Sequence, residues 1–461
     1  MASISNWSRV LKRQVAQGCQ DVLASHWSVA QTQAACHAQG YAWRDRIWTP
    51  WQTLWTFLWQ VLYAGSSCRD AVALGLAQQA AGDAMPQVSV DPTAYCQARK
   101  RLPLAVLQEG LRVIGQRLAQ QVGQAGRWCG RRAWLVDGTT CSMPDTPDLQ
   151  KAFGQPDGQA EGCGFPVAKI VAMFCWASGA VLEAAIGPCA LSELWLWRSL
   201  WHLLSAGDVV VADRFYCTFA DLAGLKARRC DGVFRLHHQR SADFRQGKPL
   251  GKNDRLVTWL RPTYQSRPRG MNRRQWQALP ETLTIRLLRF TVDIPGFRCR
   301  SIVVATSLLD PLAYSAEQIA ALYRDRWLIE LRFRDIKITL GMDVLRGKSA
   351  DVVRKEIHMH LLAYNLIRCL MWQAACDHGR NLHRLSFAGT ISYLHAVGPF
   401  LWLLRGTDKA RYLQQLLLQW IARDPNPDRP NRIEPRAVKR RPKKYSRLIQ
   451  PRRIARKALL V

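Results

Sequence analysis

Four polar side chains recur at helical spacing in the segment YRDRWLIELRFRDIK: Tyr323, Arg326, Glu330 and Lys337. An α-helix turns by about 100° per residue, so these four positions fall within an arc of about 60°. The spacing therefore predicts a phenol, two cations and a carboxylate on one face of a single helix. A carboxylate among cations suits a place where a divalent metal and a phosphate polyanion meet. The alternative is a solvated helix face that carries ion pairs such as Arg326–Glu330.

Two aspartates upstream each follow a short apolar run. RRAWLVDGTT places Asp137 after Trp134–Val136, and GDVVVADRFY places Asp213 after Val209–Ala212. Short β-branched runs bounded by Gly and polar residues predict buried strands. Functional groups gather outside the carboxyl ends of strands in open α/β sheets, and we expect both aspartates at such ends. Turn and N-cap aspartates also occur there. Taken with Glu330, the two aspartates favour one common site over three unrelated acids.

The combination of WLVDGTT, VVVADRFY and the Tyr-Arg-Glu-Lys spacing resembles the DDE transposases of bacterial insertion sequences, specifically the insertion sequence four family. The resemblance covers nearly the whole chain and extends to CRDAVA, AYCQARKRLP, GCGFPVAKIV and EPRAVKRRPKKY. It implies that the three acids form a catalytic triad. It also implies that the other signature residues hold DNA phosphates, namely Tyr323, Arg326 and Lys337. The chain departs from the family pattern at none of these six positions.

The resemblance implies a specific chemistry. Cleavage at the terminal inverted repeats of an insertion sequence would be followed by strand transfer into target DNA, in a cut-and-paste reaction. The triad would hold two Mg²⁺ ions, replaceable by Mn²⁺, with Asp137 bridging both. Two metals about 3.5–4 Å apart can stabilise both the attacking and the leaving oxygen. A ribonuclease-H-like DNA nuclease without strand transfer is one alternative. A non-catalytic DNA-binding relative is another, although it would be expected to have lost an acid.

Composition supports a polyanionic partner. The 461 residues include 65 Lys and Arg against 34 Asp and Glu, which gives a net charge of +31 and a pI of about 10.2. Basic ribosomal and membrane-surface proteins share such a balance, but nucleic acid is the partner that it favours. A hydrophobic content of 48% and 19 Trp exclude a disordered basic protein. We expect double-stranded DNA, both element ends and target, as the partner, with a homodimer forming on paired ends.

The sequence shows no secretory signal, and its least polar stretch, Leu385–Leu404, is interrupted by Ser, Gly, His and Pro. We interpret that stretch as buried helix and expect a cytoplasmic bacterial protein associated with the nucleoid. The 14 Cys form no C-x-x-C pair, which argues against a zinc ribbon and favours reduced core thiols.

Residues 1–125 predict a helical N-terminal DNA-binding domain. One helix should start with Thr49 as N-cap and Pro50 at its first position, and others should begin near Ser67 and near Asp91. The last of these carries Arg99, Lys100 and Arg101, which is typical of a helix-turn-helix-like DNA reader. The alternative is an ordinary helical cap on the catalytic domain.

Residues 126–345 predict an α/β catalytic core, which the family implies to be ribonuclease-H-like. The expected strands are Ala133–Val136, Val167–Trp176, Val181–Ile186, Val209–Ala212 and Gly232–Leu236. The expected helices are Glu193–Leu204 and Phe219–Arg228, and Thr139–Gly164 is expected to be a long loop.

A β-rich insertion at 240–312 is expected to interrupt this core, because 330 − 213 = 117 positions separate two of the acids. Its basic loops would touch DNA, or would only solvate the surface. Trp259 and Trp276 are candidates for stacking on a base, although aromatic residues more often belong to a core.

A helical C-terminal region at 346–425 and a basic, Pro-broken tail at 426–461, disordered until it meets a phosphate backbone, complete the prediction. The pairs His237–His238 and His358 with His360 could mimic a transition-metal site. However, the second pair should point to different helix faces and has no soft ligand nearby.

Overall fold

The computed structural model describes residues 26–44, 46–80, 89–264, 270–291, 301–404, 406–427 and 448–458. The chain separates into two compact units, each built from discontinuous segments. The first, here the helical unit, comprises Met1–Gln121, Ser178–Glu183 and Arg332–Asn426. The second, here the sheet unit, comprises Val122–Ala177, Ala184–Leu331 and Pro427–Val461.

The helical unit is organised around one long buried helix. This helix, α13 (Ala350–Asp377), packs against α3 (Pro50–Leu62), α6 (Leu104–Gln121), α14 (Phe387–Leu403) and α15 (Asp408–Arg423). Nearly all its residues from Val353 to Met371 are buried, as expected of a helix that is apolar on most sides. The remaining elements are α2 (Val29–Ala38), α4 (Cys68–Ala80), α5 (Thr93–Arg101), the 3₁₀ helix η5 (Leu382–Arg384) and the π-helical segment η4 (Asp335–Thr339).

The predicted start of α3 is confirmed. Thr49 is the N-cap, its hydroxyl accepts a hydrogen bond from the Gln52 amide, and Pro50 opens the helix. The other two predicted helices of this region appear as α4 and α5. The first 25 residues of the predicted N-terminal domain lie outside the described residues. Within the ranges given above, no helix is both long and apolar enough to cross a membrane.

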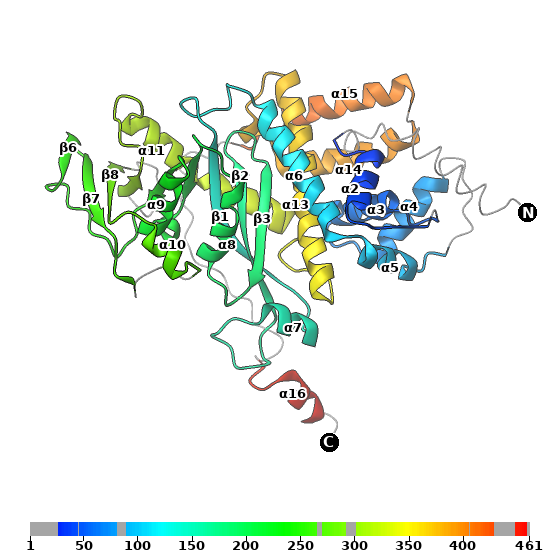
Figure 1. Ribbon diagram of the computed structural model, residues 1–461. Coiled ribbons are helices and arrows are strands. Elements are labelled where there is room, and N and C mark those ends of the chain that lie inside the picture. Colours follow the sequence, from blue (N-terminus) through cyan, green and yellow to red (C-terminus); the bar gives the residue numbers. More distant parts are fainter. Residues whose placement is uncertain are drawn as a thin grey trace, which may run out of the picture. The chain divides into compact units, whose positions relative to one another are not determined.

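The sheet unit contains a nine-stranded sheet in the order β3-β2-β1-β4-β5-β9-β8-β7-β6 (Figure 1). Its strands are β1 (Ala133–Ser142), β2 (Val167–Cys175), β3 (Val181–Pro188), β4 (Val209–Ala212), β5 (Asp231–Arg235), β6 (Lys248–Gly251), β7 (Asp254–Leu260), β8 (Thr282–Thr291) and β9 (Ser301–Thr306). The first three residues of β3 belong to the helical unit. The helices are α7 (Pro147–Phe153), α8 (Glu193–Ser199), α9 (Phe219–Ala227), α10 (Arg273–Gln277), α11 (Ala316–Arg324), α12 (Trp327–Arg334, whose last turn is in the helical unit), α16 (Arg452–Ala458) and the 3₁₀ helices η1 (Trp201–Leu203) and η2 (Arg214–Tyr216).

Strand directions within the sheet are mixed. β1 runs antiparallel to β2 and parallel to β4, β4 runs parallel to β5, and β5 runs antiparallel to β9. All four residues of β4 are buried, because it is short, central and made of Val and Ala. Among the helices, α8 packs against β2, while α9 and α11 pack against β5.

Two local predictions about the first strand are wrong. β1 continues to Ser142, and α7 follows with Thr146 as its N-cap, so Thr139–Gly164 is not one loop. Asp137 consequently lies inside β1 and not at its end. The strand continues because the residues after Val136 keep their pairing with β2, up to Ser142 opposite Val167. The pairing with β4 extends only over Ala133–Leu135, which leaves Asp137 just past its last paired position.

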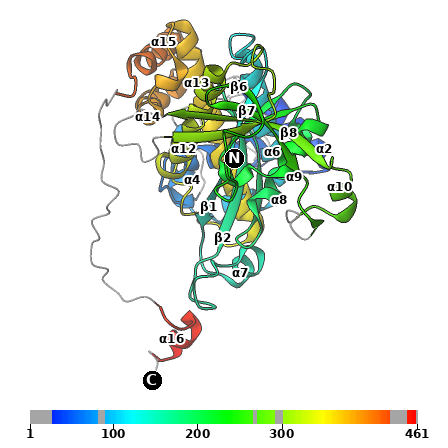
Figure 2. The ribbon, with the colours of Figure 1, turned by 90° about the vertical axis from the view of Figure 1, so that its left-hand side faces the viewer.

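Strands β6 to β9 lie within the predicted insertion at 240–312, and they continue the same sheet. β9 joins β5, and β8, β7 and β6 follow in turn to the outer edge that faces the viewer in Figure 2. In the tail, 428–447 and 459–461 lie outside the described residues. Within the described residues of the tail, Arg452–Ala458 forms the helix α16, where disorder was expected.

Candidate active site

Asp137 and Asp213 are brought together by strand register. Leu135 of β1 lies opposite Val211 of β4, and the two strands run parallel. Each aspartate stands two residues after its member of that pair. Neighbouring strands are about 4.8 Å apart, so the two carboxylates start from adjacent backbones at one level of the sheet. Asp213 also caps η2, because its Oδ1 accepts a hydrogen bond of 2.7 Å from the Phe215 amide.

Arg326 connects the third acid to the first. Its Nη1 lies 3.6 Å from Asp137 Oδ2, and its Nη2 donates to Glu330 Oε1 at 2.7 Å. The Arg326 side chain is only 18% exposed, so the guanidinium is held largely away from water between the carboxylates. Three of the sequence-predicted site residues therefore meet at one point: Asp137 of β1, Arg326 just before α12 and Glu330 of α12. In the sequence, 193 positions (330 − 137) separate the two acids.

The predicted single helix that carries all four signature residues is wrong. α11 ends at Arg324, α12 begins at Trp327, and a π-helical segment contains Lys337. At the break, hydrogen bonds of the i to i+3 type join Arg326 to Tyr323, Leu328 to Asp325 and Ile329 to Arg326. The Asp325 carboxylate at this turn accepts a hydrogen bond of 2.9 Å from Trp176 Nε1, which ties the break to the end of β2.

Two signature residues are placed differently from the others. Tyr323 is 4% exposed and packs edge-on against Phe290, with 6.3 Å between ring centroids. Burial raises the pKa of the Tyr323 phenol, which keeps it neutral. Lys337 belongs to the helical unit, where it lies in the π-helical segment η4. The phosphate-binding role of all three signature residues remains a prediction.

The electrostatics of the site reflect several partly buried carboxyl groups that lie close together. Burial raises the pKa of Asp137 to about 7, and the neighbouring charges of Asp213 and Glu193 add to the rise. A hydrogen bond from the Gly138 amide and the charge of Arg326 act in the opposite direction. Burial, followed by the charge of Asp213, likewise raises the pKa of Glu193. Carboxylates crowded in this way favour a cation close by.

Glu193 was not predicted as a site residue. It opens α8, and its Oε2 accepts a 3.4 Å hydrogen bond from the hydroxyl of Tyr216, which is fully buried. Burial raises the pKa of Tyr216 well above its ordinary value, with the nearby acids contributing. The sequence carried only a weak signal: a Glu at the start of the predicted helix that follows the third strand, which is an ordinary first-turn position.

The other residues considered from the sequence do not join this cluster. Trp259 and Trp276 are buried, and Arg240 lies over the Trp259 ring at 4.0 Å. His358 and His360 are buried in α13, each with its Nδ1 bonded to the carbonyl four residues earlier. Across the described ranges, no group of three or more His, Cys, Asp or Glu side chains is arranged to hold a metal ion.

The family called "Transposase DDE domain" matches residues 128–366, a range that contains all six sequence-predicted site residues. The transposase InsG of insertion sequence element IS4 from Escherichia coli K12 is 30% identical over 365 residues, covering 77% of this chain and 78% of that protein. The chain belongs to the DDE transposase family, in the insertion sequence four group. It is a DNA transposase, and hence a nuclease and transesterase that acts on phosphodiester bonds.

The transposase is similar to other proteins over shorter or weaker matches. The putative transposase InsL of element IS186A from the same Escherichia coli strain is 44% identical over 66 residues, or 14% of this chain and 18% of that protein. A solved piggyBac transposase synaptic complex with hairpin DNA aligns over 89% of this chain and 85% of that one, with 9% identity and a TM-score of 0.43. Likeness at that score supports no conclusion about this transposase.

Divalent metal use is general in this family, and the acids near Arg326 are of the donor type that such a metal prefers. The clustered side chains offer carboxylate oxygens, which hard cations prefer over nitrogen or sulfur. Asp137, Asp213 and Glu193 crowd negative charge into a partly buried place that one guanidinium only partly offsets. Arg326, paired with two of the acids, supplies the positive charge found there.

Proposed function

We propose that the transposase cleaves DNA at the terminal inverted repeats of an insertion sequence and transfers the freed strands into target DNA, with Asp137, Asp213 and Glu330 as catalytic acids. The observation that carries the proposal is that Arg326 pairs with both Asp137 and Glu330. The pair brings carboxylates from two distant segments to one largely buried guanidinium, and a site that cleaves phosphodiesters with metal ions needs acids gathered in this way.

The strand order supports a ribonuclease-H-like catalytic core. The run β3-β2-β1-β4-β5 has β1 antiparallel to β2, with β4 and β5 parallel to β1. In this arrangement the first and fourth strands are neighbours, which is why acids from those strands lie side by side. We further propose residues 1–125 as the DNA-binding domain, 126–345 as the interrupted core, 346–425 as the helical C-terminal region and 426–461 as the basic tail.

Mg²⁺, with Mn²⁺ able to replace it, is the cation that we propose for the three acids, as two ions. When bound, it supplies Lewis-acid stabilisation of charge at the reacting phosphate. Asp137 and Asp213 offer their oxygens from adjacent strands, and Glu330 offers its own from α12. Arg326 is placed to clamp a phosphate oxygen once its carboxylate partners are engaged elsewhere, since a guanidinium can donate two parallel bonds. We assign Tyr323 and Lys337 to the same phosphate-holding group.

Double-stranded DNA is the partner that we propose, with a homodimer forming on paired element ends. The net charge of +31 provides the general attraction to phosphate backbones. We place the protein in the bacterial cytoplasm, associated with the nucleoid.

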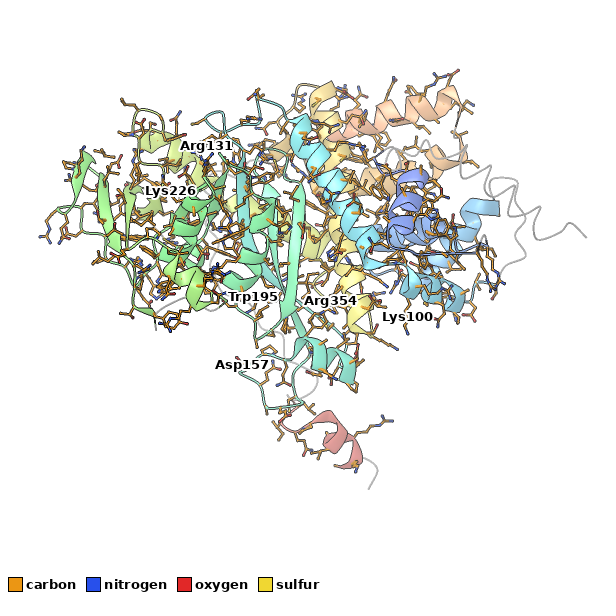
Figure 3. The ribbon with its side chains drawn as sticks, in the orientation of Figure 1. Lys100, Arg131, Asp157, Trp195, Lys226 and Arg354 are labelled. Atoms are coloured by element: carbon orange, nitrogen blue, oxygen red, sulfur yellow. The ribbon has the colours of Figure 1, made fainter. Side chains whose placement is uncertain are left out.

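The test compares the Asp137→Asn variant with wild type in a gel-shift assay and in a Mg²⁺-dependent nicking assay on element-end DNA. Nicking should be lost, while binding changes little, because binding rests on the basic surface. Asp157→Asn is the matched control, since Asp157 is an exposed loop residue of the same unit, labelled in Figure 3. Nicking by the Asp137 variant at the wild-type rate would remove Asp137 from the catalytic acids.

A nuclease without strand transfer is the second candidate, because it would need the same acids. Supplying a pre-cleaved element end with a free 3′-hydroxyl, together with a circular target, separates the two. Joined products identify a transposition reaction, whereas nicking with no joined product under these conditions identifies a nuclease.

A further inference from the structure

Glu193 packs against β1 from the face opposite the Asp137 side chain. A Cβ added to Gly138 would stand 2.5 Å from Glu193 Oε2 and 2.6 Å from its Cδ. Successive side chains of a strand point to opposite faces, so a side chain at 138 would point away from the face that Asp137 uses. The Glu193 carboxylate therefore supports the backbone of β1 from behind, one residue after the first proposed catalytic acid.

The same carboxylate is bonded to the turn that carries the second aspartate. Glu193 Oε2 accepts a hydrogen bond of 3.4 Å from the Tyr216 hydroxyl. Tyr216 is the last residue of η2, and Asp213 caps the start of η2 by accepting a bond from the Phe215 amide. The Trp197 ring, one turn further along α8, meets the Tyr216 ring edge-on at 6.4 Å. Helix α8 thus contacts η2 at two points.

Helix α8 is fixed on both of its sides. It packs against β2, and its Trp197 is fully buried. On the exposed side, Gly270 approaches Trp195, which Figure 3 labels, so closely that a Cβ at 270 would overlap the indole ring. Lys169 of β2 donates to the Leu191 carbonyl at 2.7 Å, which holds the segment leading into the helix. Residues that support a reactive group act best from such rigid elements.

A role confined to the helix terminus does not explain these contacts. An acid in the first turn commonly does no more than offset the positive end of its own helix. The Glu193 carboxylate instead reaches β1 and η2, the two elements that carry the aspartates. It has room beside β1 only because residue 138 lacks a side chain.

We propose that Glu193 is a positioning residue whose side chain fixes Asp137 and Asp213 relative to each other, through its packing against Gly138 and its bond to Tyr216. This inference rests on the proposed function, since it assumes that the two aspartates act together. In this role Glu193 acts by shape and hydrogen bonding, and not by its charge. Gln keeps the length and an acceptor oxygen, so it should replace Glu193.

The first experiment measures the single-turnover rate of Mg²⁺-dependent cleavage by the full-length protein, the Kd for the same element-end DNA and the melting temperature. Glu193→Ala should slow cleavage by about tenfold to a hundredfold with the Kd unchanged, because misplacing a reacting group by about 1 Å costs this much. Glu193→Gln should restore most of the lost rate. Glu281→Ala is the matched control, because Glu281 is exposed in the same unit and should leave the rate unchanged.

Two results of that experiment would overturn the inference. Wild-type cleavage by Glu193→Ala would show that the side chain positions nothing. A Glu193→Gln variant as slow as Glu193→Ala, with a wild-type melting temperature, would show that the negative charge is what the reaction needs.

The second experiment tests the two contacts separately and does not require Glu193→Ala to fold. Tyr216→Phe removes the hydroxyl and keeps the buried ring, so it should slow cleavage with the Kd unchanged. The double variant Tyr216→Phe/Glu193→Ala should be no slower than Glu193→Ala, a non-additive result that marks a shared interaction. Wild-type cleavage by Tyr216→Phe, or additive effects in the double variant, would overturn the role of the Glu193–Tyr216 bond.

Gly138→Ala tests the packing against β1. It places a methyl group where the Glu193 carboxylate stands, so it should slow cleavage in the wild-type background. It should slow cleavage less in the Glu193→Ala background, where that carboxylate is absent. An equal reduction in both backgrounds would show that the methyl group acts without Glu193 and would overturn the packing role.

Asp137→Asn separates failure of this inference from failure of the proposed function. If Asp137→Asn loses nicking while Glu193→Ala cleaves like wild type, the inference fails and the proposed function stands. If Asp137→Asn still nicks DNA, the proposed function fails, whatever the Glu193 variants do.

Discussion

At the scale of single residues, Arg326 pairs with two of the three acids at once. It lies in the turn between α11 and α12, and it pairs with acids from β1 and α12. In this state the guanidinium holds the carboxylates near each other and is not free for DNA. Its two roles, positioning acids and holding phosphate, make different predictions.

We expect Arg326→Ala to reduce cleavage more than binding, by about tenfold or more, because the variant cannot form the charge-assisted pairs with two acids. Removal of a phosphate contact should also make the salt dependence of binding shallower, by about 0.9 in the slope of log K against log salt. Lys337 is partly exposed. Lys337→Ala should reduce the salt slope in the same way, but it should reduce cleavage less than Arg326→Ala does. Affinity measured at several salt concentrations, beside melting temperature, gives both quantities.

A purely structural role for either cation has a distinct signature. It would lower the melting temperature and leave the salt slope at the wild-type value. Arg326→Lys is an informative companion, since lysine keeps the charge but lacks the two-point geometry. If cleavage by Arg326→Lys matches wild type, then charge alone suffices and the geometry of the guanidinium does not matter.

A histidine of the helical unit predicts a pH effect on stability. Burial, and then the charges of Arg332 and Arg368, lower the pKa of His383 to about 3 in the folded protein. Because the folded pKa lies below the ordinary value of about 6.5, its stabilising contribution is complete above pH 6.5 and is lost as pH falls toward 3. At pH 5 that loss amounts to about 2 kcal/mol.

His383→Gln should therefore flatten the fall in unfolding free energy between pH 6.5 and 4, as measured by urea denaturation at each pH. The nearby Asp335, whose pKa burial raises to about 6, titrates in both proteins and cancels from their difference. His378→Gln serves as the control, because His378 is exposed at the end of α13. Parallel pH curves for wild type and His383→Gln would contradict the prediction.

Residue types and spacing were enough to propose Asp137, Asp213, Arg326 and Glu330, because acids after apolar runs and cations at helical spacing are visible in sequence. Glu193 was missed for a physical reason. Its position depends on the missing side chain at Gly138 and on the Tyr216 hydroxyl, and neither contact has a sequence pattern. Proximity through a glycine can be recognised only in three dimensions.

At the scale of elements, the strands were predicted well and the long helix was not. β4 has the predicted bounds, and β2, β3 and β5 differ by a residue or two at their ends. Their short apolar runs give each segment a strong local preference for β-strand. The helix from Tyr323 to Lys337 was predicted from periodicity alone. Periodicity in the sequence cannot show that a tertiary contact tightens one turn and interrupts the helix. The Asp325–Trp176 hydrogen bond is such a contact.

Trp176→Phe tests whether that contact sets the position of Glu330. The change removes the donor to the Asp325 carboxylate, and hydrogen bonds to charged groups contribute about 1.5–3 kcal/mol. We expect a lower melting temperature and slower cleavage, with DNA binding retained, because α12 would lose its fixed start relative to β1.

Trp134→Phe is the matched control for ring size. Trp134 is buried in β1, and its indole Nε1 has no hydrogen-bond partner among the described residues, so the same change there removes no bond. If both variants lose equal stability and equal cleavage, then ring volume explains the result and the Asp325 contact contributes nothing.

At the scale of the whole molecule, a cluster of positive charges and the proposed catalytic acids lie in different segments of the sequence. The run Lys439–Lys444 lies in the tail, far in sequence from every acid that we propose to be catalytic. Removal of residues 428–461 should weaken binding to any duplex and reduce the salt slope by about 0.9 for each phosphate that the shortened protein no longer neutralises. Mn²⁺ affinity should not change.

Replacing Lys439, Arg440 and Arg441 together by Gln separates charge from chain length. A smaller effect of the same kind, with the slope falling and Mn²⁺ binding intact, is the expected result. A tail deletion that abolishes cleavage at low salt without changing affinity would instead give the tail a role in assembling the reaction complex.

The course of the chain between Asp213 and Glu330 has an evolutionary consequence. After β5 the chain passes through β6, β7 and β8 and returns as β9, which pairs with β5 itself, Val233 opposite Thr306. The excursion therefore ends beside the strand from which it departed. Residues can be inserted or deleted at the outer β6–β7 hairpin without altering the register of β1 and β4 or the start of α11. We expect homologues to differ in length chiefly at this hairpin. A sequence alignment that allows no gap there should match both aspartates but misplace Glu330.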